Sequence, residues 1–214
     1  MHLRSAISIV WILLSVAPAV CAQQVVDRIV ARVEDDIITL SEVRELGNFQ
    51  RLVEGHSAND EQLLRQLIEQ WIVAAEADAA RFPRPAPAEV DLEMKRLAGL
   101  FASPEAFRAQ RRELGLSEDA IRRLLVRQLW LTRYLDYKFR PAAQVDDAQV
   151  ERYYREELAP QLTARGQPVP PLDEVRERIR EVLIQREISQ RAGRWLEETR
   201  PRLRVELEPG AMKP

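Results

Sequence analysis

The chain has 214 residues, which is enough for one or two small domains with a real hydrophobic core. Charged residues make up 31% of the chain, aromatic residues make up 6%, and there are only 7 glycines, a composition that favours helices over a β-sandwich or barrel. The formal net charge of −2 leaves no basic surplus, which argues against a nucleic-acid partner.

Residues 1–22 are predicted to form a cleavable signal peptide. A positive residue and a short apolar run precede Val20 and Ala22, which occupy the −3 and −1 positions of a signal-peptidase site before Gln23. One alternative is lipidation of Cys21, which would attach the protein to a membrane, and another is an uncleaved anchor. Cleavage predicts a periplasmic protein that has no disulfide and no stable membrane insertion, because Cys21 is the only cysteine.

The exported part of the chain opens with a predicted β-hairpin. Residues 25–33 alternate in polarity, which indicates a half-buried strand with Ala31 and Val33 on its apolar face and Val30 on the other face. Residues 34–36 form a polar turn and residues 37–40 a second strand. Ser41 is predicted to cap a helix that stops at Gly55.

Helices are predicted for most of the remaining chain, because apolar residues recur at helical spacing between capping residues, prolines and glycines. Residues 159–171 carry four prolines and a glycine and are predicted to form a loop. The predicted helices begin at Asn59 or Asp60, near Val90, at Ser103, at Ser117, near Asp146 and at Asp173, and the fourth and last of them reach Phe139 and Thr199.

The last predicted element is a single strand over residues 202–207. Neither a hairpin at one end nor a lone strand at the other is stable by itself, and pairing them satisfies the backbone groups of both. The predicted fold class is therefore mainly α with a small antiparallel β-sheet formed by the N-terminal hairpin and the C-terminal strand. Residues 23–214 form one domain, with segments 25–140 and 146–207 on either side of a short break.

This order of elements resembles the SurA family of periplasmic chaperones. The stretch "VVDRIVARVEDDIITLSEV" is similar to that family's opening hairpin, "LLRQLIEQWIVAAEADAARFPRPAPAEVDLEMKRLA" to its second and third helices, and "FRAQRRELGLSEDAIRRLLVRQL" to a later helical pair. The resemblance implies a SurA-type chaperone core that acts without ATP. Family members usually carry parvulin-type prolyl isomerase domains before the last helix, whereas here residues 154–173 leave room only for a loop. The resemblance therefore implies a chaperone core without the isomerase and without enzymatic activity.

The residues themselves give little support to catalysis. His56 is the only histidine after residue 22, and its polar surroundings predict an exposed loop residue. No spacing typical of a metal or phosphate site stands out, so we expect no cofactor and no metal. Trp71, Trp130 and Trp195 lie among aliphatic residues in long predicted helices, which favours core packing.

A set of apolar residues in the third and fourth predicted helices is the candidate binding surface. Prolines and glycines on both sides would let this pair of helices stand away from the bundle as an arm, and Met and Phe suit varied apolar partners. The alternative is that the pair packs on the bundle. The candidate residues for binding clients are Met94, Leu97, Leu100, Phe101 and Phe107.

The predicted function is ATP-independent binding of unfolded or partly folded envelope proteins, which prevents their aggregation and serves outer-membrane protein assembly. Two alternatives remain: an isomerase-family protein with residual foldase activity, and an interaction subunit dedicated to one envelope partner. The sequence leaves open whether the protein forms a homodimer.

Overall fold

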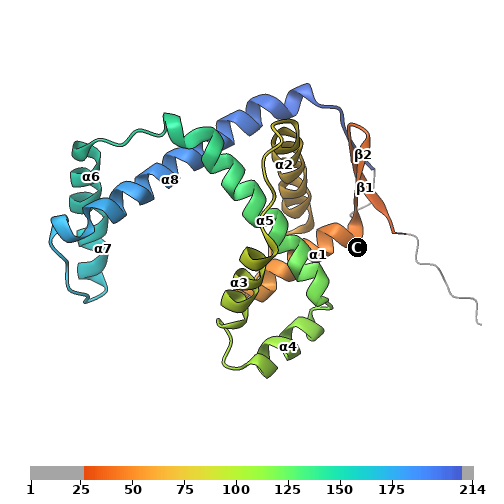
Figure 1. Ribbon diagram of the computed structural model, residues 1–214, viewed down its shortest axis with the longest axis horizontal. Coiled ribbons are helices and arrows are strands. Elements are labelled where there is room, and N and C mark those ends of the chain that lie inside the picture. Colours follow the sequence, from red (N-terminus) through yellow and green to blue (C-terminus); the bar gives the residue numbers. More distant parts are fainter. Residues whose placement is uncertain (1–26, 209–214) are drawn as a thin grey trace, which may run out of the picture.

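The computed structural model describes residues 27–208 (Figure 1). The predicted signal peptide, the cleavage site, Cys21 and the first two residues of the predicted hairpin lie outside this range. Within it the fold is mainly helical with one small antiparallel sheet, as predicted. The elements in chain order are β1 (Ile29–Val33), β2 (Asp36–Thr39), α1 (Leu40–Glu54), α2 (Asp60–Ala79), α3 (Pro87–Ala98), α4 (Pro104–Glu113), α5 (Glu118–Phe139), α6 (Asp147–Tyr153), α7 (Ala159–Ala164), α8 (Leu172–Thr199) and β3 (Val205–Leu207).

The sheet joins the two ends of the described chain. Its strand order is β2-β1-β3, and β3 runs antiparallel to β1 with Val33 opposite Val205. The Glu34 N–H donates to the Arg204 carbonyl at 3.0 Å, and the Glu208 N–H donates to the Val30 carbonyl at 3.0 Å. These bonds confirm the predicted pairing of the hairpin with the C-terminal strand.

A β-bulge corrects the predicted faces of the first strand. The register between β1 and β2 shifts between Ile29 and Ala31, so that Val30 and Ala31 are both buried, at 1% and 0% exposure. Val30 was predicted to lie on the polar face. A bulge places two successive residues against one partner and re-aims a side chain, which strict alternation along a strand does not allow.

Local capping determines where most of the helices begin. Asn59, Ser103 and Ser117 cap α2, α4 and α5, as predicted, and each side chain accepts a hydrogen bond from the backbone N–H three residues on. The cap of α1 is Thr39 and not Ser41, because Thr39 and Glu42 form a reciprocal capping box. Ser41 instead donates its hydroxyl to Asp27, a bond that holds the pKa of the Asp27 carboxyl below its ordinary value.

The segment predicted as a loop before α8 contains a helix. A π-helical turn, Tyr154–Leu158, leads directly into α7, and Pro160 occupies a first-turn position of that helix. Proline is tolerated there because its missing N–H would have no intrahelical partner. Leu158 packs against a buried cluster that includes Val150 of α6 and Ile179 of α8. Only residues 165–171 of this segment form a loop.

Figure 1 shows a molecule with two limbs that meet where α5 crosses α8. One limb holds the sheet, α1, α2, α3, α4 and most of α5. The other is the C-terminal lobe, residues 145–183, in which α6 and the π-helical turn pack on the first half of α8. Trp130 of α5 is 1% exposed in a buried cluster shared with α2, and its indole N–H donates to the Phe82 carbonyl at 3.2 Å. The prediction of core packing is confirmed for Trp130, whereas Trp71 and Trp195 are partly buried at the edges of the core.

Candidate functional site

An open apolar groove lies along α5 in the first limb. It consists of two adjoining hollows of about 370 and 360 Å³. Both hollows are lined by Phe49 and Val53 of α1 and by Gln128 and Thr132 of α5, so these four residues mark where they join. We call the two hollows together the α5 groove.

The walls of the α5 groove follow from helical spacing. Phe49 and Val53 lie four residues apart and therefore project from the same face of α1. The α5 wall is made by residues at positions i, i+3, i+4 and i+7 of one helical face. In the hollow beside α3 these α5 residues are Leu125, Gln128, Leu129 and Thr132.

The floor of the groove is buried and its rim is open to solvent. Phe49, Leu97 and Leu125 are at most 8% exposed and belong to one buried cluster. At the rim Val53 is 41% exposed and Leu100 is 70% exposed. Large apolar side chains at such exposure beside an apolar hollow are typical of a binding surface.

Polar groups at the groove include both uncharged and charged side chains. Among the residues that the structure describes, the side chains of Gln70, Gln128 and Thr132 have no hydrogen-bond partner, so they remain available to a bound molecule. Charged residues of both signs lie at the rim, and two of them, Glu93 and Arg96, pair with each other at 2.6 Å. The groove thus combines apolar walls with free amide and hydroxyl groups and has no dominant charge.

The five residues predicted to bind clients fall into two groups, those that line the α5 groove and those that pack in or beside the core. Leu97 and Leu100 line the α5 groove. Met94 and Phe107 are 9% and 8% exposed and lie in the core, and Phe101 is partly buried with its ring 5.2 Å from that of Phe107. The expected arm is therefore corrected, because α3 and α4 pack against α1 and α5, which agrees with the alternative that the pair packs on the bundle. Binding of clients by these residues stays a prediction.

Other residues of the groove were missed by reasoning from the sequence. Val53 comes near the end of α1 and carries no motif. On α5 the apolar residues lie on several faces of the helix, so their spacing does not show which face lines a groove. A helix of this kind must pack on more than one neighbour. The apolar residues of α5 that line the groove are Leu124, Leu125, Leu129, Leu131 and Leu135.

Two of the ion pairs that link α5 and its C-terminal end to neighbouring helices strongly shift the pKa of a carboxyl group. Arg140, just after α5, donates to Glu181 of α8 at 2.7 Å, and this bond lowers the pKa of the Glu181 carboxyl to about 2. Arg133 of α5 donates to both carboxylate oxygens of Glu89 at 2.7 and 2.9 Å and lowers the pKa of that carboxyl to about 2. Neither carboxylate lines the groove, and the main cause of each shift is the hydrogen bond from the paired arginine.

His56 and possible groups of metal ligands are the other features to place in the described residues. His56 is exposed, as predicted, with 78% of its side chain accessible, and its imidazole contacts the Glu54 carbonyl at 3.1 Å. Between residues 27 and 208, no group of three or more His, Cys, Asp or Glu side chains is placed to hold a metal ion. In the same stretch, no helix is both long enough and apolar enough to cross a membrane.

Comparisons with known proteins do not assign the chain to a family. No family model matches it, and no curated protein matches it either. The functional argument therefore depends on the groove, the fold and the sequence motifs.

Proposed function

We propose that this protein is a periplasmic chaperone that binds unfolded or partly folded envelope proteins without ATP. The observation that carries the proposal is the α5 groove, an open apolar surface with free amide and hydroxyl groups at its rim. Apolar side chains of a client would enter the hollows, while its backbone would bond to Gln128 and Thr132. Binding the unfolded state lowers the concentration of the species that aggregates.

The size of the groove suits weak and reversible binding. Burial of two or three apolar side chains would contribute about 3–9 kcal/mol. Most of this is offset by the lost freedom of the client and by side-chain ordering. A holding chaperone needs such a balance, because the client must leave in order to fold.

The fold supports a SurA-type core as part of this proposal. A sheet made of an N-terminal hairpin and a C-terminal strand, with helices between them, agrees with the order of elements on which the resemblance to the SurA family was based. Between α6 and α8 the chain forms only the π-helical turn, α7 and a short loop. We therefore propose a chaperone core that has no parvulin domain at this position and does not catalyse isomerisation.

The test compares two substitutions in the groove with one outside it. Val53→Asp and Leu100→Asp together place two charges on the rim, and both residues are exposed enough for the fold to tolerate the change. Leu92→Asp is the matched control, because Leu92 lies on α3, which ends two residues before Leu100, is 50% exposed and does not line the groove. Light scattering of a thermally unfolded model protein measures the suppression of aggregation.

We expect the wild type and Leu92→Asp to suppress aggregation equally. The groove variant should need roughly tenfold more protein for the same effect, since each buried charge weakens binding by at least about 1 kcal/mol. Equal activity of all three proteins would contradict the assignment to the groove. Failure of the wild type itself would contradict the chaperone proposal.

Two further measurements separate the alternatives. Acceleration of a slow proline-limited refolding reaction would favour an isomerase. Without a catalyst, cis/trans isomerisation of an X–Pro bond takes tens to hundreds of seconds. Co-purification of one stoichiometric partner from the envelope would favour a dedicated subunit, whereas many substoichiometric clients would favour a general chaperone.

A further inference from the structure

The C-terminal lobe contains a second pocket, separate from the α5 groove. Its volume is about 430 Å³, within the range of small-ligand sites. It lies between the π-helical turn, α7, the 165–171 loop and α8, on the other limb of the molecule (Figure 1). Its apolar lining residues are Tyr153, Leu158, Leu162, Val175, Ile179 and Val182.

The shape of the pocket depends on two local features. The α8 residues repeat at positions i, i+4 and i+7, so they form one wall of a single helical face. Opposite them, the π-helical turn places Leu158 toward the pocket, and π-helical turns of this kind are frequent at functional sites. The ring of Tyr153 is held by Arg186, whose guanidinium lies 4.8 Å from its centre and pairs with Glu157 at 2.8 Å.

One cation at the pocket has no acidic partner. The arginines around it on α8 are all paired: Arg176 with Asp173 and Asp147, and Arg180 with Glu177 and Asp147. Arg178 also lines the pocket, yet within residues 27–208 it has no ion pair or hydrogen bond. The pocket therefore combines apolar walls with one free guanidinium, which suits an apolar ligand that carries an anionic group.

The loop beside the pocket offers free backbone groups. Its ends are held, since the Gln167 N–H donates to the Leu162 carbonyl at 2.9 Å and the Pro170 carbonyl accepts from the Tyr154 hydroxyl at 2.8 Å. Between these bonds, the N–H and carbonyl of Val169 have no partner in the described part of the chain. Val169 itself does not line the pocket, but it lies between Pro168 and Pro170, which both do. An extended peptide has N–H and carbonyl groups to match them, whereas an alkyl chain has none.

We propose that this pocket binds the C-terminal end of a polypeptide. The last side chain, which is apolar, occupies the hollow, and the terminal carboxylate pairs with Arg178. The peptide backbone bonds to the loop at Val169. This inference rests on the proposed chaperone function and deepens it, because it assigns the pocket to the free ends of clients and the α5 groove to their internal apolar segments.

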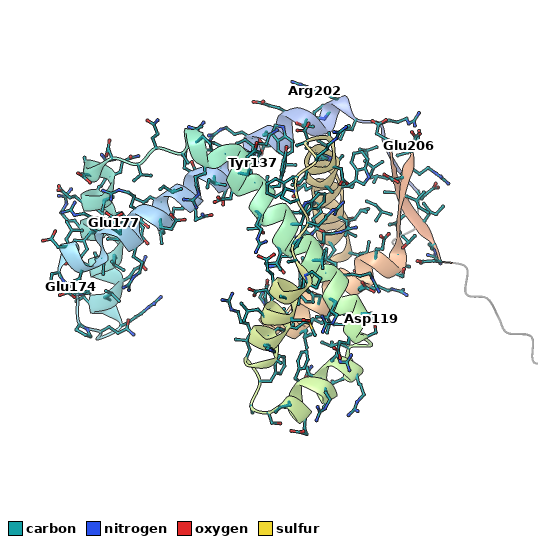
Figure 2. The ribbon with its side chains drawn as sticks, viewed as in Figure 1. Asp119, Tyr137, Glu174, Glu177, Arg202 and Glu206 are labelled. Atoms are coloured by element: carbon teal, nitrogen blue, oxygen red, sulfur yellow. The ribbon has the colours of Figure 1, made fainter. Side chains whose placement is uncertain are left out.

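Acidic neighbours limit the strength of the site. Glu174 lies one helical turn before Arg178 and Glu177 lies next to it, and Figure 2 shows both acidic residues on the first half of α8, in the C-terminal lobe. Glu177 is already paired with Arg180, and Glu174 forms no ion pair with any described residue. Removing the charge of Glu174 should therefore strengthen the binding of a carboxylate.

The first test needs no variant of the protein. Two fluorescein-labelled decapeptides of one sequence, both ending in Phe, differ only in a free C-terminal carboxylate or a C-terminal amide. Fluorescence anisotropy should show that the free acid binds about tenfold more tightly, as expected for one charge-assisted pair. Equal affinity of the two peptides would overturn the proposal.

Variants then assign the preference to the pocket. Arg178→Gln should abolish the difference between acid and amide, Arg178→Lys should retain part of it, and Glu174→Gln should increase it. Arg65→Gln is the matched control, because Arg65 is exposed on α2 and has no ion pair within the described residues. A preference for the acid that persists in Arg178→Gln would reject the assigned role of this arginine.

Two results separate this inference from its competitors. Displacement of the peptide by dodecanoate at equal or lower concentration would overturn the assignment to a polypeptide end. Wild-type protein that suppresses aggregation but shows no preference for the free acid refutes the pocket proposal alone. Protein that prefers the acid but does not suppress aggregation refutes the chaperone proposal and keeps the pocket.

Discussion

Removal of the C-terminal strand should destabilise the whole first limb. The change is a truncation after Arg200, which deletes β3 and with it the backbone bonds to Glu34 and Val30. Truncation after Glu208 is the control, because it keeps β3 and removes only residues outside the described range.

The expected loss has two main parts. Leu203 and Val205 are partly buried against the cluster of the sheet, α1 and α2, and half the burial of two such side chains contributes about 1.5–3 kcal/mol. Their removal also uncovers Ala31 and Val33, both 0% exposed, which adds about 1–2 kcal/mol. The sum is about 4 kcal/mol, which corresponds to a fall in Tm of about 8–16 °C for a domain of this size.

Thermal unfolding followed by circular dichroism measures this difference. We expect the chain truncated after Glu208 to melt with the full chain and the one truncated after Arg200 to melt well below both. If the shorter chain keeps the melting temperature of the full one, pairing of β3 with β1 contributes nothing measurable and the reasoning is refuted.

Four other substitutions test the core, an exposed position beside it and one ion pair. Trp130→Ala should lower the free energy of unfolding by about 3–5 kcal/mol in urea denaturation, because it leaves a large cavity and an unpaired Phe82 carbonyl. Phe107→Ser should cost a similar amount by the same measurement, whereas Leu100→Ser should change it by less than about 0.5 kcal/mol; equal effects would contradict their different burial. The carboxyl of Glu181 has a pKa lowered to about 2 by Arg140, so its contribution to stability is complete above the ordinary value of 4.5 and is lost as the pH falls from there through about 2. Thermal melts between these pH values should therefore show a smaller loss of stability in Glu181→Gln than in the wild type, and parallel curves would argue against the pair.

Local interactions made much of the fold predictable from the sequence. The caps Asn59, Ser103 and Ser117 bond to backbone groups three residues away, and Gly55 ends α1 with a positive φ of 78° that favours glycine. Each signal lies within one helical turn, so a single sequence contains all of it. The pairing of the chain ends was also predictable, because each set of strands would otherwise leave its backbone groups unpaired.

Only the tertiary structure decided which apolar residues are exposed. Met94 and Leu100 both looked suited to clients, yet one is 9% exposed and the other 70%, because α1 and α5 cover one face of the α3 segment and leave the other open. Helical periodicity identifies an apolar face and does not say which neighbour covers it. The bulge at Val30, the α5 groove and the pocket beside Arg178 likewise depend on segments that are distant in sequence, and these contacts exist only once the chain has folded.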